Sequence, residues 1–148
     1  MVSGPALKLN LNFSLPDSDM SAAGSASSSL KKNLMQIGVD PVIIKKAVIS
    51  LYEAEINMVI HGGGGTVDIE ITPEAVTAVL TDHGPGIPDI TLAMQEGYST
   101  ASDLIREMGF GAGMGLPNIK RNSDYLDIKS TPGVETIVTI KVKIAQDK

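Results

Sequence analysis

The sequence contains no cysteine and no tryptophan, and only 3% of its residues are aromatic. The absence of cysteine excludes disulfides, cysteine-ligated metal sites and thiol catalysis, and it fits an intracellular protein. Because aromatic rings are so few, a core must be built from aliphatic side chains and methionine. The hydrophobic fraction of 43% predicts a globular chain rather than a disordered one.

The chain also lacks an excess of basic residues and any long apolar run. Its net charge of −5 disfavours nucleic acid as the main partner, because a phosphate backbone is bound by clustered lysine and arginine. No apolar stretch approaches the roughly 20 residues that cross a bilayer, and the N-terminal residues alternate instead of forming a signal peptide. We therefore expect a cytoplasmic protein that contacts no membrane, with a single domain over residues 1–148.

The N-terminal half predicts one strand and two helices. Apolar and polar side chains alternate over residues 7–15, which is typical of a half-buried strand. Residues 20–37 repeat at helical spacing up to Gly38, although their serine, glycine and alanine content also suits a linker. Asp40 and Pro41 then begin a helix over 41–61. One stripe of that helix is expected to dock on a sheet: Ile44, Val48, Leu51, Ala54 or Glu55, and Met58.

The C-terminal half predicts two hairpins separated by a helical and glycine-rich region. One hairpin joins residues 67–71 to 76–80, and the other joins 125–130 to 135–144. Between them we expect a short helix around 89–97, a long loop to residue 115 and a helix from about Leu116 to Tyr125. Hairpins make antiparallel neighbours, and the helices would cover one face. The predicted fold class is therefore α+β, a two-layer sandwich with a mixed, mostly antiparallel sheet.

Glu53 and Asn57 are four residues apart on the predicted second helix, so their side chains share a face. Glu55 points about 200° away from Glu53 around the same helix. A glutamate and asparagine at this spacing are most often an exposed polar pair. The alternative is a carboxylate that acts as general base beside an amide oxygen that ligates Mg²⁺.

Asp82 ends a predicted strand and enters a turn that contains Gly84, Gly86 and Ile87. Glycine and proline explain a tight turn at this place without any ligand. The alternative is a purine-binding loop, because an aspartate can accept a hydrogen bond from an exocyclic amine and glycines let a ring approach the backbone.

A glycine run precedes the last predicted helix, with glycine at every second position: Gly109, Gly111, Gly113 and Gly115. Met114 and Leu116 stand where a dinucleotide fingerprint or a P-loop would need glycine, so both motifs fail. Backbone N–H groups at a helix N-terminus bind anions, so the run can cradle phosphate. Taken alone, the same run is also compatible with a loop that has no ligand.

Taken in order, these segments resemble the GHKL ATP-binding fold of DNA gyrase, Hsp90-type chaperones, histidine kinases and MutL-type proteins. Glu53 and Asn57 resemble its N box, the turn at Asp82 its G1 box, and residues 109–116 its G2 box. Thr136 would usually be structural on a strand. It stands where the family's last threonine follows a glycine turn, with Glu135 in place of the usual glycine.

Within this superfamily, one branch is most similar. The sequence shows no helix pair bearing a phosphoacceptor histidine and no large middle domain. Segments 82–101 and 113–121 resemble the bacterial anti-sigma factor/serine kinase family of RsbT- and RsbW-like switch kinases.

The resemblance implies a role for each matching residue. Glu53 would be the general base that takes a proton from a serine or threonine hydroxyl, and Asn57 would hold Mg²⁺ between the phosphates of ATP. Asp82 would bind the adenine amine, with the glycine turn admitting the ring, and Thr136 would be a further nucleotide contact. The stretch from Tyr98 would form a lid over the phosphates. The remaining implied nucleotide contacts are Gly84, Gly86, Ile87, Gly109, Gly111, Gly113, Met114, Gly115 and Leu116, with Arg106 or Lys120 neutralising phosphate charge.

The resemblance further implies a partner-switching protein kinase. Its substrate would be a STAS-domain antagonist, and a sigma factor or a phosphatase would be its second partner. The resemblance also implies a homodimer, because family members of the anti-sigma type often dimerise. The alternatives are a nucleotide-gated anti-sigma factor without catalysis and a slow ATPase module.

Overall fold

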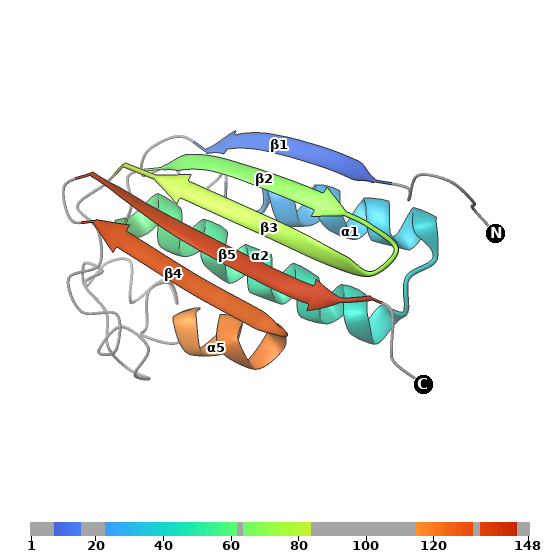
Figure 1. Ribbon diagram of the computed structural model, residues 1–148. Coiled ribbons are helices and arrows are strands. Elements are labelled where there is room, and N and C mark those ends of the chain that lie inside the picture. Colours follow the sequence, from blue (N-terminus) through green and yellow to red (C-terminus); the bar gives the residue numbers. More distant parts are fainter. Residues whose placement is uncertain (1–7, 16–22, 62–63, 84–114, 132–133, 145–148) are drawn as a thin grey trace.

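The computed structural model describes residues 8–15, 23–61, 64–83, 115–131 and 134–144 (Figure 1). The elements follow in the order β1 (Leu9–Leu15), α1 (Ser25–Ile37), α2 (Pro41–His61), β2 (Gly65–Ile71), β3 (Ala75–Asp82), α5 (Gly115–Asn122), β4 (Tyr125–Thr131) and β5 (Glu135–Lys143). Within these ranges no helix is long and apolar enough to span a bilayer. The short helix expected around 89–97 and the glycine-rich loop lie outside the described residues.

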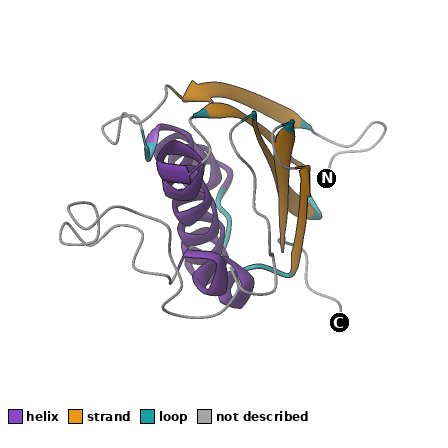
Figure 2. Ribbon diagram, turned by 90° about the vertical axis from the view of Figure 1, so that its left-hand side faces the viewer, coloured by secondary structure: helices purple, strands orange, loops and turns teal. Residues whose placement is uncertain are grey.

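The five strands form one sheet in the order β1-β2-β3-β5-β4, and every pair of neighbours is antiparallel. The two predicted hairpins are confirmed as β2–β3 and β4–β5, which join at the centre through β3 and β5. The described helices, α1, α2 and α5, lie on one face of the sheet (Figure 2). The predicted α+β two-layer sandwich is therefore confirmed, and the described sheet is entirely antiparallel rather than mixed.

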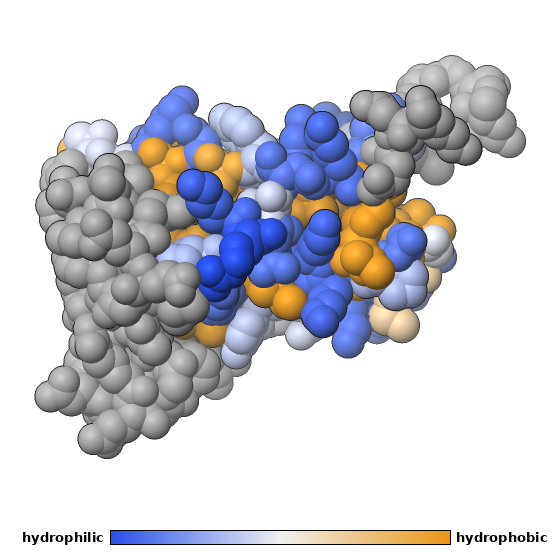
Figure 3. Space-filling model, turned by 90° about the horizontal axis from the view of Figure 1, so that it is seen from below, coloured by the Kyte–Doolittle hydropathy of each residue, from blue (hydrophilic) through white to orange (hydrophobic). Residues whose placement is uncertain are grey.

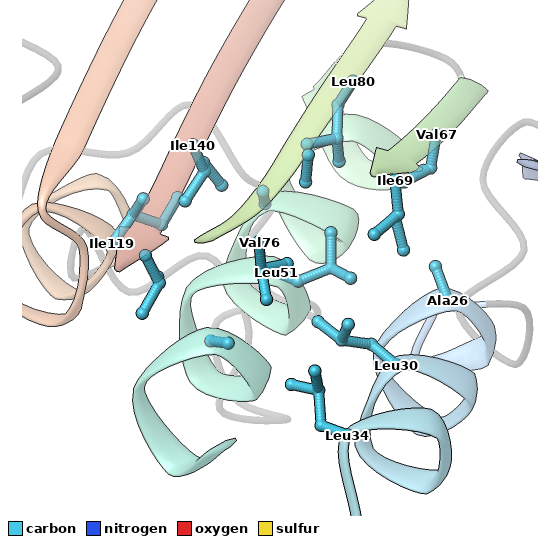
Figure 4. Close-up of a cluster of buried hydrophobic side chains, with 14 of the residues drawn as sticks. Ala26, Leu30, Leu34, Leu51, Val67, Ile69, Val76, Leu80, Ile119 and Ile140 are labelled. Carbon is cyan, nitrogen blue, oxygen red and sulfur yellow. The ribbon is translucent and has the colours of Figure 1, made fainter. Parts of the chain in front are cut away.

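The core lies between the helices and the sheet, because strand alternation points every second side chain toward the helices. On β2 these are Val67, Ile69 and Ile71, each at most 4% exposed. Figure 4 shows how side chains from all three helices meet those of the strands. The labelled members of this cluster are Ala26, Leu30, Leu34, Leu51, Val67, Ile69, Val76, Leu80, Ile119 and Ile140.

Local sequence signals explain most helix boundaries. α1 ends at Gly38, whose left-handed backbone (φ 88°) lets its N–H bond the carbonyls of Leu34 and Met35. α2 begins after Asp40, whose Oδ1 accepts a hydrogen bond of 2.8 Å from the Val42 N–H. The expected sheet-docking stripe of α2 is buried at Ile44, Leu51, Ala54 and Met58, with Val48 half-buried.

Two helix boundaries differ from the prediction. α1 begins at Ser25, after a turn at residues 23–24 with Gly24 as N-cap, whereas the sequence pattern placed the start near residue 20. α5 ends at Asn122, whereas the sequence pattern extended it to Tyr125. The Ser123 hydroxyl bonds the Ile119 carbonyl at 2.7 Å, and the Asp124 N–H bonds the Lys141 carbonyl at 2.8 Å. Asp124 therefore already pairs with β5, and Tyr125 starts β4.

Glu55 joins α2 to α1 through a buried carboxylate. Its side chain is 0% exposed, and its two oxygens accept backbone N–H bonds from Gly24, Ala26 and Ser27 at 2.8, 3.1 and 2.8 Å. These are the unsatisfied donors of the first turn of α1, and a negative charge is favoured at this end of a helix. Gly24, the N-cap residue, has no side chain for capping. Glu55 therefore replaces a local cap with one from another helix.

Candidate functional site

The candidate site is built along the face of α2 that lies opposite Glu55. Glu53 and Asn57 lie on this face, one turn apart, and both side chains are half-buried. α5 packs against α2. The predicted sharing of a face follows directly from the uninterrupted helix over both residues.

Two successive side-chain hydrogen bonds link α5 to Glu53. The Asn118 amide nitrogen Nδ2 donates to Glu53 Oε2 at 3.3 Å. The Arg121 guanidinium Nη2 in turn donates to Asn118 Oδ1 at 2.7 Å. Within the described residues, Glu53 therefore accepts one hydrogen bond, at Oε2, and none at Oε1.

The C-terminal end of α2 and the end of β3 converge at Gly65. A Cβ added there would lie 2.1 Å from the Thr81 carbonyl oxygen and 3.0 Å from both the Asp82 Cα and the Met58 sulfur. Met58 directly follows Asn57 in α2. This close approach, which only glycine permits, brings Asn57 and Asp82 to the same end of the molecule.

Asp82 and Thr136 lie directly opposite each other on β3 and β5. They are 7% and 3% exposed, so both are buried polar residues. The next strand adds Ser130, whose hydroxyl lies 2.8 Å from the Thr136 Oγ1. The three side chains form a polar row across the end of the sheet. The His83 Nδ1 lies 3.1 Å from the Val134 carbonyl oxygen and links the same two strand ends.

The predicted phosphate loop leads into α5. Gly115 is the first residue of the helix, and Leu116 is 8% exposed in the core. The other predicted contacts lie outside the described residues and stay predictions: Gly84, Gly86, Ile87, Tyr98, Arg106, Gly109, Gly111, Gly113 and Met114.

The donor set fits Mg²⁺ carried by a nucleotide. Among the described residues, no three histidine, cysteine, aspartate or glutamate side chains cluster as a metal site. Mg²⁺ commonly takes only one or two protein oxygens and completes its shell with substrate phosphates and water. The half-buried amide of Asn57 offers an oxygen of the required hard type.

The model of one protein family matches residues 17–142, and its description is "Histidine kinase-like ATPase domain". The chain belongs to this family. The match covers both the α2 face with Glu53 and Asn57 and the polar row of Asp82 and Thr136. The family resemblance predicted from the sequence is therefore confirmed.

Two named relatives align with most of this chain. An anti-sigma F factor from Thermoanaerobacter sp. (strain X514) is 35% identical over 117 residues, which are 74% of this chain and 78% of the relative. The serine/threonine-protein kinase RsbT of Bacillus subtilis (strain 168) is 31% identical over 122 residues, 80% of this chain and 84% of the relative.

Solved structures share the fold at low sequence identity. The structure of the RsbU and RsbW domains of Rv1364c from Mycobacterium tuberculosis superimposes with a TM-score of 0.64 at 20% identity, covering 94% of this chain and 33% of that chain. In the SiaB–SiaC complex from Pseudomonas aeruginosa, the matching chain gives a TM-score of 0.61 at 16% identity, with 89% and 88% covered. Both support the two-layer fold.

Sequence reasoning missed the contacts of three residues: Asn118 and Ser130 at the site, and Glu55 on the opposite face of α2. Each makes its contact across a large gap in sequence or across strands. One signal was present for Glu55, since a glutamate in the apolar stripe of α2 needs buried donors. The sequence offered no comparable signal for Asn118.

Proposed function

We propose that this chain is an ATP-dependent protein serine/threonine kinase of a partner-switching module, formed as a single domain over residues 1–148. The observation that supports the proposal is the burial and hydrogen bonding of the Glu53 side chain. Its carboxylate is half-buried, fixed through Oε2 by a neutral amide, and one turn from an asparagine that suits Mg²⁺. A general base needs this combination of fixed position and a free oxygen.

In this proposal Glu53 Oε1 accepts the proton of the attacking serine or threonine hydroxyl. Asn57 would hold Mg²⁺, which would supply charge neutralisation at the phosphates. Asp82 accepts a hydrogen bond from the adenine amine beside the Thr136 hydroxyl, and both lie in a buried part of the sheet end where such bonds are strong. Phosphoryl transfer requires mainly positioning and charge neutralisation, so these groups are sufficient.

The phosphates would be held by the glycine run that leads into α5. Its described end, Gly115 and Leu116, starts an eight-residue helix that contains Pro117 in its first turn. The N–H groups at the N-terminus of a helix are suited to bind an anion. Lys120 lies on the exposed side of α5, and we assign it, with Arg106, to neutralising phosphate charge.

The acceptor we propose is a STAS-domain antagonist. The support is the similarity to chains named RsbT serine/threonine-protein kinase and anti-sigma F factor, at 31% and 35% identity. A phosphate adds about two negative charges and three strong acceptors, which is enough to break an interface. Release of the antagonist would free the kinase, as a monomer or a homodimer, for a sigma factor or a phosphatase.

A second candidate is a nucleotide-gated anti-sigma factor without catalysis. The similarity to anti-sigma F factors favours a sigma-binding role. Glu53 separates the two candidates, because a protein that uses ATP only to set its shape needs no general base.

The test is transfer of phosphate from γ-³²P-ATP with Mg²⁺ to each recombinant STAS-domain protein of the source organism, followed by phosphosite mapping. We expect one acceptor to be labelled on serine or threonine, and Glu53→Gln to lower the rate about 100-fold or more while ATP still binds. Glu74→Gln, in the exposed β2–β3 turn, is the matched control. Tight ATP binding with no labelled acceptor would favour the non-catalytic candidate.

A further inference from the structure

We propose that Asn118 is a positioning residue that holds the Glu53 carboxylate in place for proton transfer. The inference rests on the proposed function, in which Glu53 is the base. It assigns a task to Asn118, which lies in the segment 113–121 but has no role implied by the family resemblance.

The contact joins two helices that are far apart in the chain. Asn118 Nδ2 and Glu53 Oε2 are 3.3 Å apart across 65 residues of sequence, in a part-buried position. Both side chains are half-buried, so neither is free to sample many rotamers in water. Among the described residues this is the hydrogen bond that restrains Glu53.

Arg121 determines which way the Asn118 amide points. A guanidinium has donors only, so the group it contacts at 2.7 Å must be the amide oxygen. The amide nitrogen then necessarily faces Glu53. The amide orientation is thus fixed by the exposed Arg121 on the same helix face, three residues further along α5.

A neutral donor suits a general base better than a cation does. A guanidinium bonded directly to a carboxylate strongly favours its charged form, which weakens the carboxylate as a proton acceptor. An amide makes a weaker bond that orients the carboxylate and leaves its second oxygen open. Asn118 places such an amide between Arg121 and Glu53.

The position of Asn118 also relates the base to the phosphate loop. It lies in the first turn of α5, three residues after Gly115, at the end of the predicted glycine run. Correct placement of α5 against α2 therefore places the base as well. A displacement of about 1 Å at a reacting group can lower a rate about 100-fold, so this contact is expected to affect transfer more than binding.

The discriminating variant is Asn118→Asp, which keeps the size and shape of the side chain and its bond to Arg121 but presents a carboxylate to Glu53. The matched control is Asn122→Asp on the same helix, because within the described residues Asn122 Nδ2 bonds the Asn118 backbone oxygen, at 2.9 Å, and makes no bond to Glu53. Asn118→Gln, which retains an amide, is the conservative variant. Each is measured for ATP affinity, unfolding midpoint and single-turnover transfer of ³²P to the STAS-domain acceptor.

We expect Asn118→Asp to lower the transfer rate about 10- to 100-fold, with ATP affinity within threefold of the wild type, and Asn122→Asp to transfer near the wild-type rate. Asn118→Gln is expected to recover part of the loss. Equal rates for Asn118→Asp and Asn122→Asp would overturn the inference, as would parallel loss of ATP affinity and transfer, since that indicates a structural role. A wild-type chain that transfers no phosphate overturns the proposed function and this inference together.

Discussion

The two faces of α2 carry the same side chain, glutamate, in opposite circumstances. Glu55 faces α1, is 0% exposed and accepts three backbone N–H bonds. Glu53 faces α5, is half-buried and accepts one side-chain N–H bond. They are two residues apart and about 200° apart around the helix.

The number and kind of donors separates a structural carboxylate from one that is available for chemistry. On the Glu55 face, three backbone donors use both oxygens and fix the start of α1. On the Glu53 face, one neutral amide bonds Oε2, and no other described residue makes a hydrogen bond to Oε1. Figure 3 shows the side of the molecule that lies below in Figure 1, where hydrophilic residues and separate apolar patches alternate over the described surface. The hydrogen-bond partners of Glu55 and Glu53 are what distinguish the two faces of α2.

The largest stability effect is expected for Glu55→Ala. The change leaves three N–H groups of α1 without their acceptor in a buried site, and we expect it to lower the free energy of unfolding by about 3–5 kcal/mol. Chemical denaturation measures the loss. A loss below about 1 kcal/mol would show that water satisfies the start of α1, and the contrast between the faces would fail.

The next largest loss of stability is expected for Gly65→Ala, which tests the close approach of α2 to β3. A Cβ would lie 2.1 Å from a backbone oxygen that cannot rotate away, so we expect a loss of about 3 kcal/mol. Gly38→Ala is the control, since Gly38 has a positive φ but nothing within 4 Å of its Cβ position. That control should lose about 1–2 kcal/mol. Similar losses of unfolding free energy for Gly65→Ala and Gly38→Ala would contradict a steric clash at Gly65.

Asp40→Ala compares an ordinary helix cap with the cap supplied by Glu55. Asp40 is exposed, and among the described residues its side chain accepts one bond, from the Val42 N–H, so we expect a loss of about 1 kcal/mol. The measurement is again the unfolding free energy. A loss as large as that of Glu55→Ala would mean that burial adds nothing to a cap in this protein.

The smallest stability effect is expected for Glu53→Ala. One half-buried side-chain bond is lost, and the change in unfolding free energy should stay within about 1 kcal/mol. The melting curve of this variant should nearly overlay that of the wild type. A large loss would place Glu53 with Glu55 as a structural residue.

Local patterns were sufficient to predict most of the fold. Alternation gave both hairpins, and Asp40, Pro41 and Gly38 gave the boundary between α1 and α2, because each signal lies within a few residues of its effect. The junction of β3 with β5, and the early end of α5, depend on pairing with distant residues. Local patterns do not carry that information.

The candidate site was predictable in its motif residues and unpredictable in its supports. Glu53 and Asn57 share a face because helix periodicity requires it, and Asp82 ends a strand as its alternation indicated. Glu55 bonds residues 28 to 31 positions earlier, and Asn118 bonds one 65 positions earlier. Such contacts follow from the packing of one helix on another, which a single sequence does not specify.

The central claim is that one helix divides its two glutamates between catalysis and folding. The most direct measurement compares Glu53→Gln and Glu55→Gln in parallel, by unfolding free energy and by single-turnover transfer of ³²P from ATP to the STAS-domain acceptor. We predict that Glu53→Gln lowers the transfer rate about 100-fold or more while its free energy of unfolding stays nearly unchanged. For Glu55→Gln we predict that the main loss is in the free energy of unfolding. The account would be contradicted if Glu53→Gln transferred phosphate at the wild-type rate.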